Sequence, residues 1–113
     1  MNVANIFSPL PENLEHEFVD TLIEKGHVKI ERIVSKGHRS PDTGWYDQNQ
    51  DEWVIVLQGA AILSFPDDEP VSLKVGDHVC IPAGCRHRVS WTDPNMETVW
   101  IAVFYGAIDN TAA

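Results

Sequence analysis

From Gly26 to Tyr105 the chain is a succession of short runs in which apolar and polar residues alternate. A period of two places successive side chains on opposite faces of a β-strand. The runs are rich in β-branched and aromatic residues and are separated by Gly, Pro, Asn and Asp; they read HVKIERIVS, WVIVLQG, AILSF, VSLKV, HVCIPAG, HRVSW and TVWIAVFY. About eight strands over this length predict an antiparallel all-β sandwich or barrel.

Length and charge narrow the class of protein. The 113 residues predict a single domain over 1–113. The net charge of −9 argues against a nucleic acid or an anionic membrane surface as partner, because phosphate groups require a basic face. No apolar run approaches the ~20 residues that cross a bilayer, and the first residues lack a basic region followed by an apolar core. We therefore expect a cytoplasmic protein whose two cysteines are free thiols.

The one helical pattern lies near the N-terminus, in PENLEHEFVDTLIEKG. Leu14, Phe18 and Leu22 follow one another at intervals of four, acidic residues occupy the first turn, and a glycine follows the last. This pattern predicts a short α-helix over about 11–25, packed on the outside of a barrel that spans about 27–105.

The segment GDHVCIPAGCRH resembles the second sequence motif of the cupin superfamily, G-x5-P-x-G-x2-H-x3-N. Gly76, Pro82, Gly84 and His87 occupy the motif positions, and only the last differs, because Trp91 stands where the family has Asn. The spacing also makes physical sense: a strand leads into a proline-containing turn, and the next strand begins with a side chain directed into the barrel.

The first cupin motif, G-x5-H-x-H-x3/4-E-x6-G, is matched only in its second half. Glu52 and Gly59 fit E-x6-G, whereas the two histidine positions hold other residues: Tyr46 and Gln48 with the shorter gap, Trp45 and Asp47 with the longer one. Over nearly the whole chain the sequence resembles small single-domain bacterial cupins of the RmlC-like type, whose activity is unassigned. The resemblance implies a double-stranded β-helix, the cupin jelly roll, with the predicted helix added outside.

The resemblance also implies a divalent-metal site, of Zn, Ni or Fe, inside the barrel. His87 and Glu52 are the expected ligands, because imidazole and carboxylate both suit such ions. Alternation lets only one of two adjacent residues face inward, so the rest of the shell stays open among Gln48, Asp47, Tyr46 and His38. The alternative is that Glu52 and His87 only hydrogen-bond one another as buried polar groups must.

A small organic molecule is the expected partner of such a barrel. Tyr46 and Trp91 are candidate pocket walls, and Arg86 at the barrel mouth could bind a carboxylate or another anion. Arg86 and Arg88 could equally share the solvated outer face. A metal-dependent enzyme of the oxygenase or isomerase type and a non-catalytic, ligand-binding or sensory cupin both agree with these residues, so whether the chain is an enzyme stays open.

The last strand, TVWIAVFY, bears on assembly. It is long and apolar, and such a strand at the edge of a sheet promotes association unless something covers it. The sequence therefore predicts a homodimer.

Overall fold

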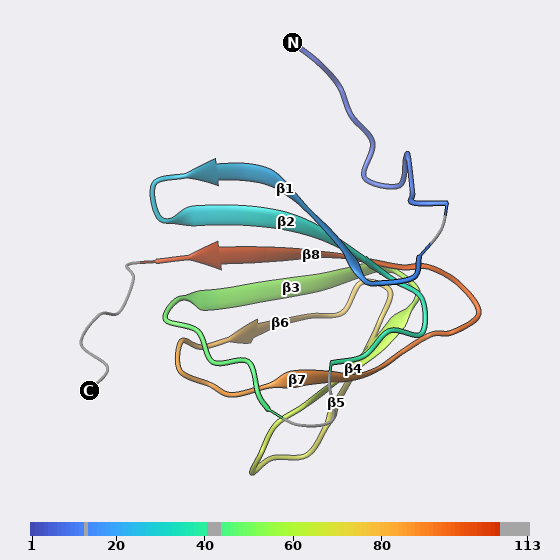
Figure 1. The fold of residues 1–113 in the computed structure, drawn as a ribbon. Coiled ribbons are helices and arrows are strands. Elements are labelled where there is room, and N and C mark those ends of the chain that lie inside the picture. Colours follow the sequence, from blue (N-terminus) through green and yellow to red (C-terminus); the bar gives the residue numbers. More distant parts are fainter. Residues whose placement is uncertain (13, 41–43, 107–113) are drawn as a thin grey trace.

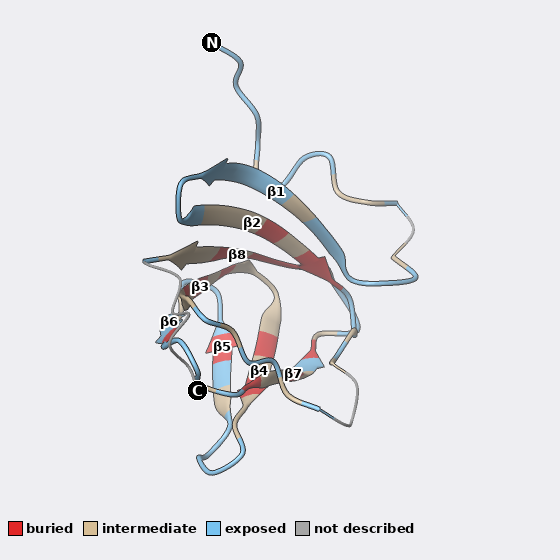
Figure 2. Cartoon of the chain, turned by 60° about the vertical axis from the view of Figure 1, so that its left-hand side comes forward, coloured by how far each residue is buried: buried red, intermediate tan, exposed pale blue. Residues whose placement is uncertain are grey.

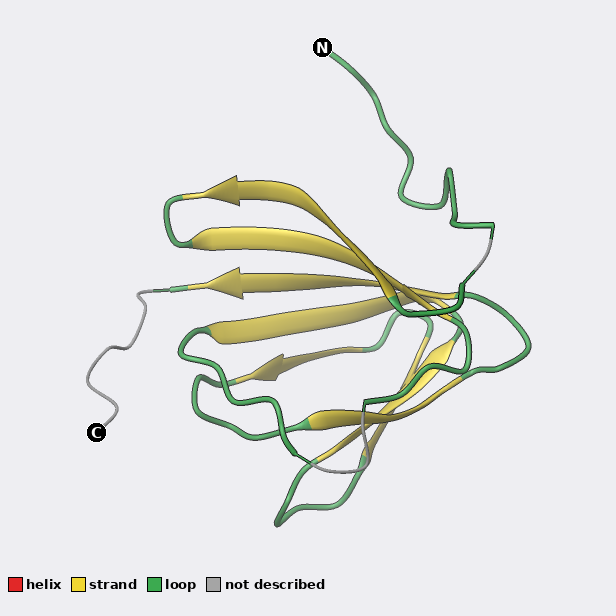
Figure 3. Cartoon of the chain, viewed as in Figure 1, coloured by secondary structure: helices red, strands yellow, loops and turns green. Residues whose placement is uncertain are grey.

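The computed structural model describes residues 1–12, 14–40 and 44–106, and these form strands and loops (Figure 1). No helix occurs in these ranges (Figure 3), so none in them is long and apolar enough to cross a membrane. The strands are β1 (Phe18–Lys25), β2 (Val28–Ser35), β3 (Asp51–Gln58), β4 (Ala60–Ser64), β5 (Val71–Lys74), β6 (His78–Ile81), β7 (Arg88–Thr92) and β8 (Thr98–Tyr105).

The strands form two antiparallel sheets that face each other. The larger sheet has the order β1-β2-β8-β3-β6, seen from top to bottom in Figure 1, and the smaller has the order β5-β4-β7. Both sheets contribute buried residues, shown in red in Figure 2, whereas β1 is almost entirely exposed. The core between the sheets contains Val54, Val56, Ala61, Leu63, Leu73, Ile81, Val89, Trp100 and Ala102. The jelly-roll prediction is therefore confirmed as an all-β, two-sheet fold.

The predicted helix over about 11–25 is wrong, because residues 18–25 form strand β1. This strand pairs with β2 from Phe18↔Val34 to Lys25↔Val28. Gly26 adopts a φ of 59° in the two-residue turn between the strands, so the glycine that we interpreted as a helix end is a hairpin glycine. Backbone pairing with β2 outweighs a weak helical periodicity. The sheets therefore begin at Phe18 rather than near residue 27.

Strand β8 is not at an edge of a sheet. It lies between β2 and β3 and pairs with both along its whole length. Both hydrogen-bonding edges of its backbone are thus paired within the chain, and the edge strands of the larger sheet are β1 and β6. The homodimer was predicted because this apolar strand was expected at the edge of a sheet, and that reason no longer holds. The homodimer stays a prediction.

Candidate ligand-binding site

A cavity of about 190 Å³ lies between the two sheets. Most of its wall is apolar, and the apolar side chains come from both sheets: Val19, Ile33, Val54, Leu63, Ile81, Val89, Trp100 and Phe104. The remaining lining residues are polar or acidic: Glu17, Glu31, Tyr46, Gln48, Glu52 and His87. A mostly apolar cavity with a few polar groups is the usual form of a small-molecule site.

Glu52 and His87 meet in the wall of this cavity. Glu52 is on β3, next to Ile81 and Phe104 on the neighbouring strands, and His87 immediately precedes β7. Their exposed fractions are 8% and 4%, and His87 Nε2 lies 3.4 Å from Glu52 Oε1. Glu52 belongs to the first sequence motif and lies in the larger sheet, whereas His87 belongs to the second motif and lies next to the smaller sheet. The structure thus brings these two residues together.

The proton positions of this pair follow from its other contacts. His87 Nδ1 lies 3.0 Å from the carbonyl oxygen of Cys85, which can only accept, so Nδ1 carries a hydrogen. In a neutral imidazole Nε2 is then an acceptor, and it faces a carboxylate oxygen. Two acceptors at this distance repel each other unless a proton or another positive charge lies between them. Gln48 Nε2 donates to the same Glu52 oxygen at 2.7 Å.

These contacts shift the pKa of His87. Burial lowers the pKa, but the hydrogen bond with Glu52, the bond to the Cys85 carbonyl and the charge of Asp47 raise it, and the net direction is upward. The protonated imidazole is therefore more favoured in the folded protein than in the unfolded chain.

This upward shift predicts a pH-dependent stability. The contribution of His87 is fully present below the unfolded pKa of about 6.5 and is lost as the pH rises through the folded pKa. We expect the free energy of unfolding, measured by urea denaturation, to decrease between about pH 6 and pH 8 in wild type. His87→Gln should lose this part of the slope, whereas His16→Gln, at an exposed position, should keep it. Identical slopes in all three proteins would contradict the assigned pair.

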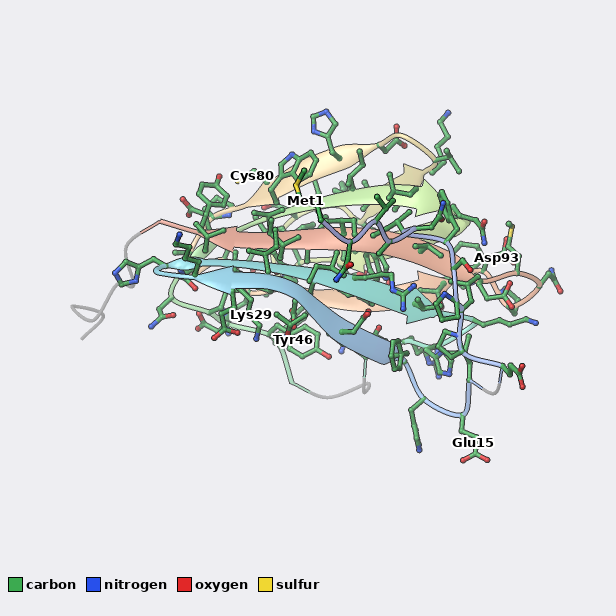
Figure 4. All side chains as sticks on the ribbon, turned by 90° about the horizontal axis from the view of Figure 1, so that it is seen from above. Met1, Glu15, Lys29, Tyr46, Cys80 and Asp93 are labelled. Carbon is green, nitrogen blue, oxygen red and sulfur yellow. The ribbon has the colours of Figure 1, made fainter. Side chains whose placement is uncertain are left out.

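Of the two possible alignments of the first motif, the shorter gap agrees with the geometry. Tyr46 and Gln48 line the cavity, whereas Asp47 is exposed and Trp45 lies under the guanidinium of Arg88 at 4.6 Å. Tyr46 and His87 exchange two backbone hydrogen bonds, of 2.8 and 3.1 Å, and their ring centroids are 5.8 Å apart. Figure 4 shows Tyr46 and Lys29 on one side of the larger sheet and Cys80 on the other.

Trp91 and Arg86 lie outside the wall of this cavity. Trp91 pairs with Ile62 while Val89 pairs with Leu63, so Ser90 is an extra residue in β7. Such a bulge reverses the alternation, and Trp91 therefore no longer shares the inward face of Val89. It is 40% exposed, and Arg86 is exposed as well. Arg86 therefore does not line the cavity, and the structure does not support its predicted role in binding an anion there.

His38 is engaged elsewhere. Its Nδ1 accepts a hydrogen bond from Lys36 N at 2.9 Å, so Nε2 donates to the carbonyl oxygen of Leu14, 3.1 Å away. Both ring nitrogens of His38 are thus hydrogen-bonded to backbone groups, and His38 does not line the cavity. The cysteines Cys80 and Cys85 are free thiols, as expected.

Two acidic residues of the cavity wall were missed by sequence reasoning: Glu17 and Glu31. Glu31 shares a strand face with Ile33 in VKIERIV, but Val28, Ile30 and Val34 lie on the opposite face, so alternation alone does not show that Glu31 faces inward. Glu17 lies within the segment of the predicted helix, and no role was predicted for it from the sequence. Ser35 Oγ donates to Glu17 Oε2 at 3.2 Å, and burial of the carboxyl group raises the pKa of Glu17 above its usual 4.5.

Comparison with known proteins decides the family. The family model described as a cupin domain matches residues 32–104, which include both motifs. The chain belongs to the cupin family. A crystal structure of a provisionally assigned mannose-6-phosphate isomerase from Ralstonia eutropha JMP134 is 42% identical and has a TM-score of 0.90; the match covers 95% of this cupin and 100% of that chain.

More distant matches support the fold of this cupin. An RmlC-like cupin from Methanocaldococcus jannaschii is 22% identical over 84% of each chain, with a TM-score of 0.66. The uncharacterized protein YdbB of Bacillus subtilis (strain 168) is 42% identical over 50 residues. That match covers 41% of this cupin and 44% of YdbB, so it spans less than half of the curated relative.

The donor groups of the cavity do not complete a transition-metal site. Such sites use at least three protein ligands with nitrogen, sulfur or carboxylate donors. Glu52 and His87 supply two, and within the described ranges no group of three His, Cys, Asp or Glu side chains is placed to hold a metal ion. Gln48 directs its amide nitrogen, which cannot coordinate, toward Glu52. Any metal here would need the Gln48 amide to turn over or a ligand that is not part of the wall.

Proposed function

We propose that this cupin binds one small organic molecule in the cavity, with the His87–Glu52 pair as its polar anchor. The observation that carries the proposal is this buried pair in the wall of a mostly apolar cavity of about 190 Å³. Buried polar groups are normally fully satisfied, and at a pH above the raised pKa of His87, where the imidazole is neutral, two acceptor atoms face one another. A hydrogen-bond donor or a positive charge on a bound molecule would stabilise both.

Similarity to the Ralstonia protein, which is provisionally assigned as a mannose-6-phosphate isomerase, suggests a sugar phosphate as a candidate ligand. Phosphate groups are bound in proteins by Arg, Lys or clustered backbone N–H groups. The described residues that line the cavity include neither Arg nor Lys, and three of them are glutamates. We therefore do not extend that substrate to this cupin.

The proposal is tested by nuclear magnetic resonance with a panel of small, water-soluble neutral, cationic and anionic compounds. Compounds that bind should shift backbone resonances of Gln48, Val54 and Leu63, which surround the cavity. His87→Ala should weaken their binding, while His16→Ala, at an exposed position, should not. Shifts confined to outer-face residues such as Cys80, or no shifts with any compound, would refute the proposal.

A divalent metal is a second candidate, favoured by the same pair of facing acceptors. We predict that Zn²⁺, Ni²⁺ or Fe²⁺ binds weakly, because only Glu52 and His87 are strong ligands. Removing one of two such ligands by His87→Ala should reduce affinity by at least about tenfold. Calorimetric titration of the metal-free protein measures this, with His16→Ala as the control. Equal affinities in the two variants would exclude this metal site.

A further inference from the structure

We infer that the cavity takes a compact organic cation that also carries a neutral hydrogen-bond acceptor, as a hydroxyalkyl ammonium compound does. This inference rests on the proposed function, because it names the chemical class of the molecule that the same cavity would hold. It follows from the charges around the cavity, from its aromatic side chains and from one buried donor that has no partner.

Acidic side chains line the cavity on two sides. Glu52 lies beside His87, while Glu31 and Glu17 lie on the side formed by the β1–β2 hairpin and the residue before it. Among the described lining residues none is Lys or Arg. Glu17 is exposed, but Glu52 and Glu31 are largely buried, and charges act strongly on a neighbouring molecule where the dielectric constant is low, so this wall attracts a cation and opposes an anion.

Apart from His87, which lies in the wall and whose raised pKa favours a proton next to Glu52, the positive groups near these carboxylates lie outside the cavity. Lys29 Nζ is 3.5 Å from Glu31 Oε2, but the lysine side chain is 42% exposed and is not part of the wall. Glu17 accepts a hydrogen bond from the uncharged Ser35 hydroxyl group. Water screens the lysine charge on its exposed side, although the Glu31 side chain itself is only 15% exposed. Neither neighbour places a buried positive charge beside a bound molecule.

The remaining wall suits an alkylated ammonium group. Tyr46, Trp100 and Phe104 contribute aromatic rings, and aliphatic side chains fill the spaces between them. Aromatic faces attract cations through their quadrupole, and they bind quaternary ammonium groups without requiring hydrogen bonds. The apolar wall and the acidic wall therefore favour the same kind of ligand.

Trp100 supplies the second requirement. Its side chain lines the cavity, the residue is 3% exposed, and its Nε1 is buried without a hydrogen-bond partner among the described residues. An indole N–H only donates, and a buried donor without a partner is uncommon and costly. Because this nitrogen has almost no accessible surface, the indole ring must turn slightly before a hydroxyl oxygen of the ligand can accept its hydrogen bond, and that oxygen adds none of the negative charge that the glutamates oppose.

Three probes of nearly the same shape separate charge from size. Choline is a cation, 3,3-dimethyl-1-butanol is its neutral analogue with the same hydroxyl group, and 3,3-dimethylbutanoate is an anion. Affinity is measured by calorimetry, and the chemical shift of the Trp100 indole N–H, assigned with Trp100→Phe, reports the site. We expect choline to bind about tenfold more tightly than the alcohol, and the carboxylate to bind most weakly.

The variant Glu31→Gln tests the source of this preference. It should lower the affinity for choline by about fivefold to tenfold and leave the affinity for the alcohol unchanged. Glu69→Gln is the matched control, since it removes the same charge from an exposed turn outside the cavity and should change neither affinity.

The outcomes separate this inference from the proposed function. If the alcohol or the carboxylate binds as tightly as choline, or if Glu31→Gln leaves the preference intact, the inference is overturned and the proposed function stands. If none of the three probes binds, the inference also fails, and the wider panel of compounds then decides the proposed function on its own.

Discussion

Replacement of Gly59 by alanine is expected to lower the free energy of unfolding by about 3 to 5 kcal/mol. Gly59 joins β3 to β4 with a φ of 86°, a conformation that residues with a side chain rarely adopt. An added Cβ would contact the Thr98 hydroxyl oxygen and would lie 2.7 Å from the Thr98 Cα. Thr98 is fully buried, and its hydroxyl group bonds with Ala60, so the backbone of β8 cannot move aside without loss.

The matched control for this substitution is Gly76→Ala, in the other cupin motif. Gly76 has a φ of 90°, but an added Cβ would meet no atom within 4 Å. Only the backbone strain remains, so we expect a loss of about 1 kcal/mol. Urea denaturation of both variants measures the difference. Equal losses would show that the close approach to Thr98 is not what requires a glycine at position 59.

The second large effect is expected from Arg32→Ala, which should cost about 2 to 4 kcal/mol. Arg32 is 6% exposed and lies on the outer face of β2. Its Nε and Nη2 donate to the two carboxylate oxygens of Asp20 at 2.9 and 3.3 Å. Its Nη1 donates to the carbonyl oxygens of Ile6 and Pro9 at 3.2 and 3.0 Å. One buried guanidinium thus ties the N-terminal segment and β1 to the sheet.

A test of this role follows the N-terminal segment directly. In Arg32→Ala we expect faster proteolysis and faster amide hydrogen exchange within residues 5–10, because the carbonyl groups there lose their donor. Asp20→Asn should show a smaller effect, since the segment keeps both of its bonds to Arg32. The exposed Arg86 supplies the control Arg86→Ala, which should resemble wild type. Unchanged exchange in Arg32→Ala would contradict the anchoring role.

Local sequence patterns determined most of the strands and the centre of the site. Seven alternating runs became β2 to β8, because alternation already says which side chains face inward. Both motif segments brought their polar residue to the cavity, and Glu52 and His87 lie 3.4 Å apart. The motif glycines at positions 59 and 76 both have a positive φ. Each of these predictions depends on neighbours along the chain, whose preferences are readable residue by residue.

Only the tertiary structure decided the rest. The segment 18–25 has weak signals for both helix and strand, and pairing with β2 selects the strand. The central position of β8 is a matter of strand order, which alternation does not encode. One extra residue in β7 turns Trp91 out of the face it would otherwise share. Glu17, Glu31 and Trp100 join the cavity because the hairpin and β8 converge on it from distant parts of the chain. Contacts between distant segments depend on how the sheets assemble, and local periodicity carries no information about that assembly.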